Sequence, residues 1–459
     1  MQTLFLNVSL VVHGIFAKPC NRSFGLNSTP HSRSACFHPL RLQDSQRIEK
    51  SRNRFLSVTA HEFHAEEAES PAKRLFRCME EAGAVQSFAP YRSSTDSPWI
   101  TAFSYGSEKD EEALRASSKG VAIADRSHWA RLKVSDADRI RFLHGQSTND
   151  ILKLKAGQST MTTFCTSTAR IIDLAEVFVS EEAVFLIVSP NRRDTVLKHV
   201  DKYIFFADKV KLDDLTEKTA MFTLMGPAST ELLLRLGIDT RDMCGLPGAF
   251  KFFSCTLKSG DNIDCMLIRS SGLQSIEGFT LIANADRAME LWRVLVNNGA
   301  RPLGALQWEQ LRILDGRPAP DSELTEDYNV LEAGLWDTVS FDKGCYLGQE
   351  TLAKLNTYKG VKTQLWGFRF AVGEDGVAPQ PGADVYTVDG GDKVGVLTSR
   401  TFMGKDWVGL GYVRTKAADS DKGEGMTVRV GNDVTAVLFR PPFIKHQTGE
   451  PAQKFSRAL

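Results

Sequence analysis

The sequence predicts an α+β fold that is followed by a small antiparallel β-barrel. From about residue 116, short β runs alternate with amphipathic helices, and this alternation forms two similar strand-and-helix halves. After Lys359 the pattern changes to about six short alternating runs separated by Gly and Asp, with no segment of helical period between them. Such runs are typical of an antiparallel barrel.

The first half is expected to begin with a strand at 131–134 and a helix that Ser135 caps and Gly145 ends. A buried strand follows at 183–189. The next helix carries one apolar stripe, formed by Val196, Leu197, Val200, Tyr203 and Ile204.

The second half repeats this order with a strand at 221–225 and a helix that Pro227 opens and Gly237 closes. Further strands are expected near 252–257, 265–268 and 279–282, and then a helix that ends at Gly299. The clearest runs of the barrel are 383–388, 394–397, 408–413 and 427–430.

The composition excludes several classes of protein. The chain has 459 residues, 42% of them hydrophobic, which is enough for two or three packed domains. Lys+Arg and Asp+Glu both number 56, and this balance argues against a general nucleic-acid binder. The eight cysteines form no C-x-x-C pair, so we expect neither a four-cysteine metal site nor a disulfide framework. No apolar run is long enough to span a bilayer.

The first 60 residues are typical of an organelle transit peptide. Their eight basic residues are opposed only by Asp44 and Glu49, serines are frequent, and no hydrophobic periodicity persists. The basic residues begin late, at Lys18, which favours a plastid presequence over a mitochondrial one. We therefore expect the protein in the chloroplast stroma, with the mitochondrial matrix as the alternative.

The octapeptide 343–350, Lys-Gly-Cys-Tyr-Leu-Gly-Gln-Glu, is the strongest candidate for a functional site. Its mixture of a thiol, charges and an amide does not suit a hydrophobic core, where each polar group needs a partner. A lone cysteine is more often an inert, small hydrophobic residue, but the polar, glycine-bracketed setting favours a reactive role for Cys345. Cys165, in a strand-like run, is expected to be structural.

This octapeptide resembles the K-G-C-[FY]-x-G-Q-E signature of the YgfZ-type iron–sulfur maturation proteins, folate-binding relatives of the GcvT-type aminomethyltransferases of glycine cleavage. Five further segments resemble motifs of the same superfamily: 124–128, 142–150, 311–313, 332–335 and 441–443. The resemblance covers roughly residues 120 to 445. It implies two ferredoxin-like, aminomethyltransferase-type α+β subdomains around a central opening that admits tetrahydrofolate, with a C-terminal antiparallel β-barrel.

Two departures from the aminomethyltransferase pattern bear on the chemistry. Leu174 stands where those enzymes have the aspartate associated with catalysis, and a leucine can neither take a proton nor stabilise an iminium ion. Ile276 stands where their loop has a glutamate that grips the pterin, and Glu277 comes one residue later. The sequence therefore argues against glycine-cleavage chemistry, whereas tetrahydrofolate binding stays an expectation.

The resemblance also implies roles for individual residues. Cys345 is the expected catalytic or cluster-binding thiol, and Lys343 is expected to lower the pKa of that thiol. Contacts to a cluster or partner are expected from Lys343, Gly344, Tyr346, Gly348, Gln349 and Glu350. The candidate folate-binding residues are Asp125, Glu277, Arg312 and Glu332. Asp125 also has a simpler interpretation as a cap, and Glu332 as a surface carboxylate.

Three functions from different classes follow. The first is a folate-dependent maturation factor for iron–sulfur proteins, in which Cys345 shares a transient cluster with A-type carrier proteins that serve client enzymes. A thiolate is a natural ligand for iron, but one cysteine cannot hold a cluster alone. The alternative is a tetrahydrofolate-dependent one-carbon transferase or demethylase. The third is a thiol enzyme, with His128 or His144 as the base.

The expected organisation has five parts. Residues 1–60 form the transit peptide and 61–115 an N-terminal extension of the mature chain. Residues 116–360 form the folate-binding domain with its two α+β halves, 361–445 the barrel, and 446–459 a disordered tail.

Overall fold

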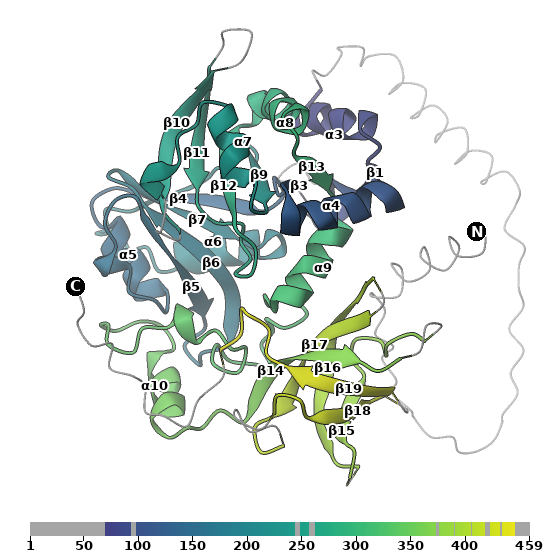
Figure 1. Cartoon of the computed structure of the whole chain (residues 1–459). Coiled ribbons are helices and arrows are strands. Elements are labelled where there is room, and N and C mark those ends of the chain that lie inside the picture. Colours follow the sequence, from purple (N-terminus) through teal and green to yellow (C-terminus); the bar gives the residue numbers. More distant parts are fainter. Residues whose placement is uncertain are drawn as a thin grey trace, which may run out of the picture. The chain divides into compact units, whose positions relative to one another are not determined.

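The computed structural model describes residues 69–92, 98–243, 248–256, 262–372, 376–389, 391–404, 406–417, 423–431 and 434–445. All of these belong to one compact unit that begins at Ala68 (Figure 1). The predicted transit peptide (1–60) and the predicted C-terminal tail (446–459) lie outside the described residues.

The first half is an antiparallel sheet of five strands in the order β5-β6-β7-β4-β8. The strands are β4 (Ala130–Ser135), β5 (Gln158–Cys165), β6 (Ile171–Val179), β7 (Ala183–Val188) and β8 (Lys211–Asp214). Helices α5 (Arg139–Gln146) and α6 (Arg193–Asp201) cover its outer face through a shared core. The predicted cap at Ser135 is wrong, because the helix begins four residues later and Asp138 instead accepts a hydrogen bond from the backbone of Lys209.

The second half is a six-stranded sheet in the order β10-β11-β12-β9-β3-β13. Its strands are β3 (Ala122–Asp125), β9 (Thr219–Met225), β10 (Phe250–Thr256), β11 (Asn262–Ile268), β12 (Gly278–Asn284) and β13 (Arg301–Leu303). Strand β3 precedes the whole first-half sheet in the chain, yet it lies between β9 and β13 and pairs in parallel with β13. The two halves are therefore interleaved along the sequence.

Helices from both ends of this region cover the outer face of the second sheet. They are α3 (Pro71–Glu81), α7 (Ser229–Arg235) and α8 (Ala288–Asn297), which share one core with the strands. Helices α4 (Ser107–Lys119) and α9 (Ala305–Asp315) build a second, smaller core, and the hairpin β1 (Val85–Arg92) and β2 (Pro98–Ser104) completes this part. Residues 71–92 and 98–119 thus contribute directly to the packed structure.

The inner faces of the two sheets meet in an apolar layer. Phe178 of β6 and Phe250 of β10 contact each other there, with ring centroids 5.7 Å apart. Because side chains alternate between the faces of a strand, Phe178 and Glu176 point toward the second half while Ala175 and Val177 point into the helix-covered core.

Six strands after residue 362 close into an antiparallel barrel in the order β14-β17-β16-β15-β18-β19. They are β14 (Thr363–Phe370), β15 (Asp384–Thr387), β16 (Lys393–Met403), β17 (Asp406–Arg414), β18 (Thr427–Val430) and β19 (Val434–Phe439). Gly367 is required where β14 meets β19, because a Cβ there would lie 2.5 Å from the ring of Phe439. The predicted α+β fold with a C-terminal barrel is confirmed.

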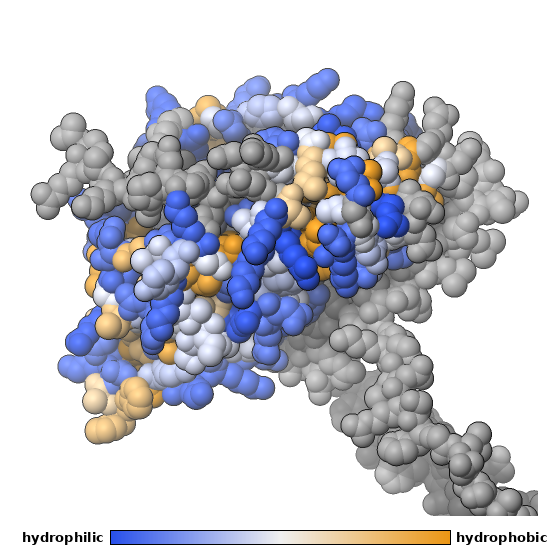
Figure 2. Space-filling view, turned by 90° about the horizontal axis from the view of Figure 1, so that it is seen from below, coloured by the Kyte–Doolittle hydropathy of each residue, from blue (hydrophilic) through white to orange (hydrophobic). Residues whose placement is uncertain are grey.

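The remaining elements are short. Helix α10 (Gln349–Thr357) precedes the barrel, and the 3₁₀ turns are η2 (Ile151–Lys153), η3 (Pro190–Arg192), η4 (Arg241–Met243), η5 (Ala285–Arg287) and η6 (Trp336–Thr338). Of the helices in the described ranges, none has both the length and the apolar character needed to cross a bilayer. In Figure 2, hydrophilic residues cover most of the coloured surface, and apolar residues form small patches among them.

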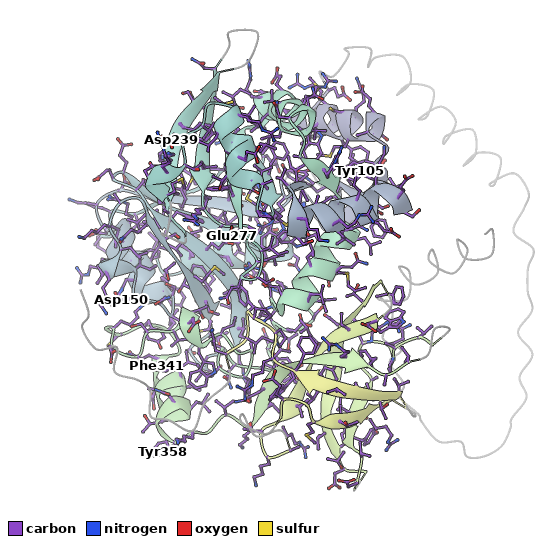
Figure 3. The ribbon with its side chains drawn as sticks, viewed as in Figure 1. Tyr105, Asp150, Asp239, Glu277, Phe341 and Tyr358 are labelled. Atoms are coloured by element: carbon purple, nitrogen blue, oxygen red, sulfur yellow. The ribbon has the colours of Figure 1, made fainter. Side chains whose placement is uncertain are left out.

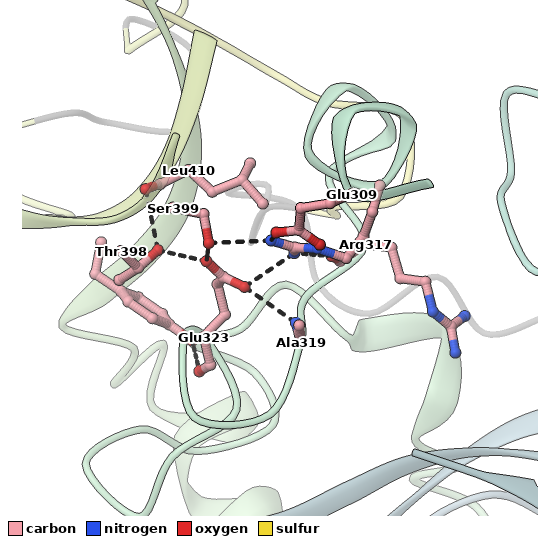
Figure 4. A network of polar contacts seen from close by, with 9 residues as sticks. Glu309, Arg317, Ala319, Glu323, Thr398, Ser399 and Leu410 are labelled. Atoms are coloured by element: carbon pink, nitrogen blue, oxygen red, sulfur yellow. Dashed lines mark hydrogen bonds and ion pairs between the residues drawn. The ribbon is translucent and has the colours of Figure 1, made fainter. Parts of the chain in front are cut away.

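Arg312 of α9 connects the α+β part to the barrel through Glu323 and Ser399, which are labelled in Figure 4. Its guanidinium group forms ion pairs with Glu309 at 2.7 Å and with Glu323 at 3.1 Å, and donates to the hydroxyl of Ser399 on β16 at 3.0 Å. Glu323, whose side chain is fully buried, accepts further hydrogen bonds from Thr398 and Ser399 of the same strand, both at 2.6 Å. This network fixes the barrel strand against α9.

Candidate functional site

A pocket of about 560 Å³ lies between the two halves, which places it where the central opening was expected. Residues 159–161 of β5, Glu176 of β6 and the β11–β12 loop (269–278) line it, with Arg317 after α9 and Phe443 after the barrel. Glu277 belongs to this loop, near the middle of the view in Figure 3. The pocket is thus built by segments that are far apart in the sequence.

The β11–β12 loop is held in place by Asp315, the last residue of α9. The fully buried carboxylate of Asp315 accepts hydrogen bonds from the backbone N–H of Gln274 at 2.9 Å and of Ser275 at 2.7 Å. Arg317 donates to the carbonyl of Gly272 at 3.0 Å. Gly272 has a φ of +78°, and a Cβ there would lie 2.7 Å from Nη1 of Arg126. These contacts hold the loop in one conformation beside the pocket.

Charged groups are concentrated beside and under this pocket. Arg126 lies between two indole rings, 3.9 Å from that of Trp129 and 4.5 Å from that of Trp308. Burial lowers the pKa of Arg126 to about 9, and the carboxylate of Glu176 opposes this shift. Burial raises the pKa of Asp173 to about 6, although its carboxylate accepts a hydrogen bond from the backbone of Ser189 at 2.8 Å.

Of the four candidate folate-binding residues, Glu277 lines the pocket, at its exposed rim. Asp125 accepts a hydrogen bond from the backbone N–H of Ser127 at 2.9 Å, which fits the simpler interpretation as a cap, and burial raises its pKa. Glu332 accepts from the hydroxyl of Thr363 at 3.0 Å and so anchors the start of β14. Arg312 belongs to the network with the barrel.

The positions that depart from the aminomethyltransferase pattern are both apolar in the structure. Leu174 is 1% exposed and packs in a core with Ile171 and Tyr346. Ile276 lines the pocket. The pocket therefore takes its carboxylates from Glu176 and Glu277, which stand at other positions.

The loop that carries Cys345 is fixed by Lys343. Its ammonium group donates to three backbone carbonyls, those of His144, of Ser147 at 2.7 Å and of Asn149 at 2.8 Å. It also lies 4.8 Å from the ring of Tyr346. Burial lowers the pKa of Lys343 to about 8, and Asp150 and Cys165 act in the opposite direction. These contacts assign Lys343 to docking the loop on the first half.

Leu347 and Gly348, the next part of the octapeptide, fit closely against the end of β5. Gly348 has a φ of +81°, and a Cβ there would lie 2.8 Å from the carbonyl oxygen of Thr166 and 2.9 Å from Sγ of Cys165. Cys165 donates to the carbonyl of Leu347 at 3.2 Å, and burial raises its pKa to about 12. Gln349 and Glu350 then begin α10.

Cys345 itself is exposed, whereas the other cysteines in the described ranges (Cys78, Cys165, Cys255 and Cys265) are buried. Its neighbours Gly344 and Glu350 are exposed too, and Glu350 pairs with Lys354 at 2.6 Å. Lys343 and Tyr346 are buried. The loop thus turns its thiol outward while two of its side chains anchor it.

The two histidines considered as a base lie in different places. Burial lowers the pKa of His128 to about 3, and Arg126 and Arg131 add to the effect. His144 lies next to the motif, since a Cβ on Gly344 would be 4.0 Å from its Nε2, and its Nδ1 is 3.4 Å from Asp150. Within the described part of the chain, no group of three or more His, Cys, Asp or Glu side chains is arranged to hold a metal ion.

Sequence reasoning missed Glu176, Arg317 and Asp315. Glu176 had a detectable signal, because it is a carboxylate within a strand whose other buried positions are largely apolar. Arg317 and Asp315 follow or end a helix, and no local pattern indicates that they reach the β11–β12 loop some 40 residues earlier.

Comparisons with known proteins identify the family of this chain. The model of the GCVT N-terminal domain family matches residues 78–343, and the chain belongs to this family. A chloroplastic "putative transferase" of Arabidopsis thaliana is 40% identical over 343 residues, which are 74% of this chain and 75% of the relative. An aminomethyltransferase of Halalkalibacterium halodurans is 27% identical, with 76% of this chain and 92% of that protein covered.

A solved structure supports the fold. The glycine cleavage system aminomethyltransferase T from Bartonella henselae superposes with a TM-score of 0.67 at 20% sequence identity, covering 81% of this chain and 98% of that one. The aminomethyltransferase-type fold that the sequence predicted is therefore confirmed.

Replacing Lys343 by methionine should lower the thermal stability of the protein. The substitution leaves three carbonyls without this donor, two of them buried and one part-buried, and an unsatisfied buried group costs about 1–3 kcal/mol. Thermal unfolding followed by circular dichroism measures the effect, with Lys354→Met as the exposed control that should change nothing. A Lys343→Met protein as stable as the wild type would show that the loop is held by other contacts.

Proposed function

We propose that this protein is a folate-dependent maturation factor for iron–sulfur proteins. It binds tetrahydrofolate in the pocket between the two halves and presents Cys345 to a transient cluster. The observation that carries the proposal is the outward thiol of Cys345 on a loop whose Lys343 and Tyr346 are buried. An exposed thiol on an anchored loop suits ligand exchange with a partner, because the thiolate is the species that binds iron.

The cluster is cargo in this proposal. A single thiolate cannot hold it, so the remaining ligands are assigned to an A-type carrier protein, and the cluster passes to client enzymes. Gly344 and Glu350, exposed on either side of Cys345, are the motif residues that such a partner would meet first. Gln349, which donates to the carbonyl of Lys343 at 3.4 Å, shapes the loop from within.

The second candidate is a tetrahydrofolate-dependent one-carbon transferase or demethylase. Membership of the GCVT family and the names of the relatives favour it. Leu174 argues against this candidate, because it occupies the position at which the aminomethyltransferase pattern has a carboxylate. Turnover of a methylated amine in the presence of tetrahydrofolate would favour this candidate over the maturation factor.

Both candidates require that reduced folate binds. Isothermal titration calorimetry with tetrahydrofolate should show one site per chain, and saturating ligand should raise the melting temperature. At a free concentration of 100 Kd the stabilisation would be about 2.7 kcal/mol. Absence of both heat and thermal stabilisation at high folate concentration would remove folate from the proposal.

We also propose that the protein acts in the chloroplast stroma. The sequence of residues 1–60 and the chloroplastic relative support this location. A fluorescent fusion of residues 1–60 that stayed in the cytosol or entered mitochondria would contradict it.

A further inference from the structure

Glu176 is a buried carboxylate whose hydrogen bonding is incomplete. Its side chain is 6% exposed and lines the pocket from the middle of β6. One carboxylate oxygen, Oε1, has no hydrogen-bond partner among the described residues, and the other accepts one long hydrogen bond of 3.4 Å from the hydroxyl of Ser270. Buried polar atoms are almost always paired, so this carboxylate has acceptor capacity that a ligand can use.

Two guanidinium groups lie close enough to this carboxylate to interact with it. Arg126 and Arg317 both interact electrostatically with Glu176, although no ion pair within 4.0 Å joins it to another side chain of the described residues. The two guanidinium groups thus supply positive potential without occupying the acceptor sites of the carboxylate. A ligand that brings N–H donors can therefore bind to it directly.

The pocket walls define the shape of that ligand. Met161, Leu273, Ile276 and Phe443 provide apolar contact around the single buried carboxylate. A volume of about 560 Å³ falls within the range of small-molecule sites. This arrangement suits a flat heteroaromatic ring with two adjacent N–H donors on one edge. The 2-amino group and N3–H of a reduced pterin are such an edge.

We propose that Glu176 is the residue that recognises the pterin ring, by accepting two hydrogen bonds from its 2-amino group and N3–H. This inference rests on the proposed binding of tetrahydrofolate. Glu277, the glutamate that the sequence analysis proposed, lies at the exposed rim of the pocket. Its carboxylate stays hydrated there, so a hydrogen bond to a ligand would only replace one to water. Glu176 is the pocket carboxylate that is removed from water.

The test compares Glu176→Gln with the control Glu182→Gln, which changes an exposed glutamate outside the pocket. Glutamine keeps the size of the side chain but replaces one acceptor by a donor that would face the donors of the pterin. By calorimetry, Glu176→Gln should bind tetrahydrofolate about 10- to 100-fold more weakly, the loss expected for charge-assisted hydrogen bonds. Its affinity for p-aminobenzoylglutamate, which lacks the pterin, should not change. Glu182→Gln should bind tetrahydrofolate like the wild type.

A change in the ligand provides a test that does not depend on the folding of a variant. The wild type should bind 2-desamino-2-methyltetrahydrofolate at least about tenfold more weakly than tetrahydrofolate, because one donor is lost. If Glu176→Gln is folded, it should show a much smaller difference between these ligands, since the partner of the 2-amino group is already gone.

The outcomes separate the inference from the function on which it rests. If wild-type protein binds no tetrahydrofolate, the folate part of the proposed function fails and this inference fails with it. If wild-type protein binds tetrahydrofolate and its 2-desamino analogue equally, the function stands and the role of Glu176 is refuted. Unchanged tetrahydrofolate affinity in Glu176→Gln, with tighter binding of p-aminobenzoylglutamate, would show that Glu176 is only the counter-ion of the two arginines.

Discussion

Cys345→Ser should give a folded protein that no longer supports maturation of iron–sulfur proteins. The side chain is exposed, so the substitution removes no buried contact, while a hydroxyl is a poor ligand for iron. We expect the melting temperature to stay at the wild-type value and complementation of a maturation-deficient strain to be lost. Full complementation by Cys345→Ser would refute the role of this thiol.

Cys165→Ser is the matched control for this experiment. Cys165 lies directly beneath the motif, 1% exposed, and donates to the carbonyl of Leu347. A serine can also donate there but packs less well, so we expect lower stability and retained complementation. The opposite pair of results, with loss of folding in Cys345→Ser and loss of function in a stable Cys165→Ser, would assign the chemistry to the buried cysteine.

Arg312→Met should destabilise the protein by about 3–5 kcal/mol, the usual cost of leaving a buried charge without its partner. The variant leaves the carboxylate of Glu323 without its ion-pair partner, and this side chain has no solvent exposure. It also removes the hydrogen bond between α9 and Ser399 of the barrel. Urea denaturation followed by tryptophan fluorescence measures the change in the free energy of unfolding.

The double variant Arg312→Met/Glu323→Gln is the control. If the stranded charge is the cause, removing it should restore part of the lost stability, because replacing both members of a buried pair costs less than removing one. A single variant that loses less than about 0.5 kcal/mol would show that the network does not hold the barrel in place.

Much of the fold followed from local patterns. The six alternating runs after residue 362 form a closed barrel because each run has its own period of two and its own turn residues. Alternating or apolar runs also located β4, β7, β9, β10, β11 and β12, whereas β5, β6, β8 and β13 were not predicted. The place of β3 was not predictable, since a four-residue strand gives little signal and its pairing with β13 is set by contacts about 180 residues apart.

The candidate site was predictable only where its chemistry is local. The octapeptide 343–350 stood out by composition, and Cys345 is indeed exposed. The role of Lys343 was not visible, because its acceptors are backbone carbonyls about 195 residues earlier. The role of Arg312 was not predicted either. The family resemblance suggested a contact to the ligand, whereas its side chain binds Glu309, Glu323 and Ser399.

In the proposed function, Cys345 exchanges a cluster with a carrier while folate occupies the pocket. The direct measurement is anaerobic reconstitution of the mature protein with a cluster-loaded A-type carrier, followed by visible absorption with and without tetrahydrofolate. We expect a folate-dependent spectral change in the wild type that Cys345→Ser does not show. Identical spectra for both proteins, or a change that is independent of folate, would contradict it.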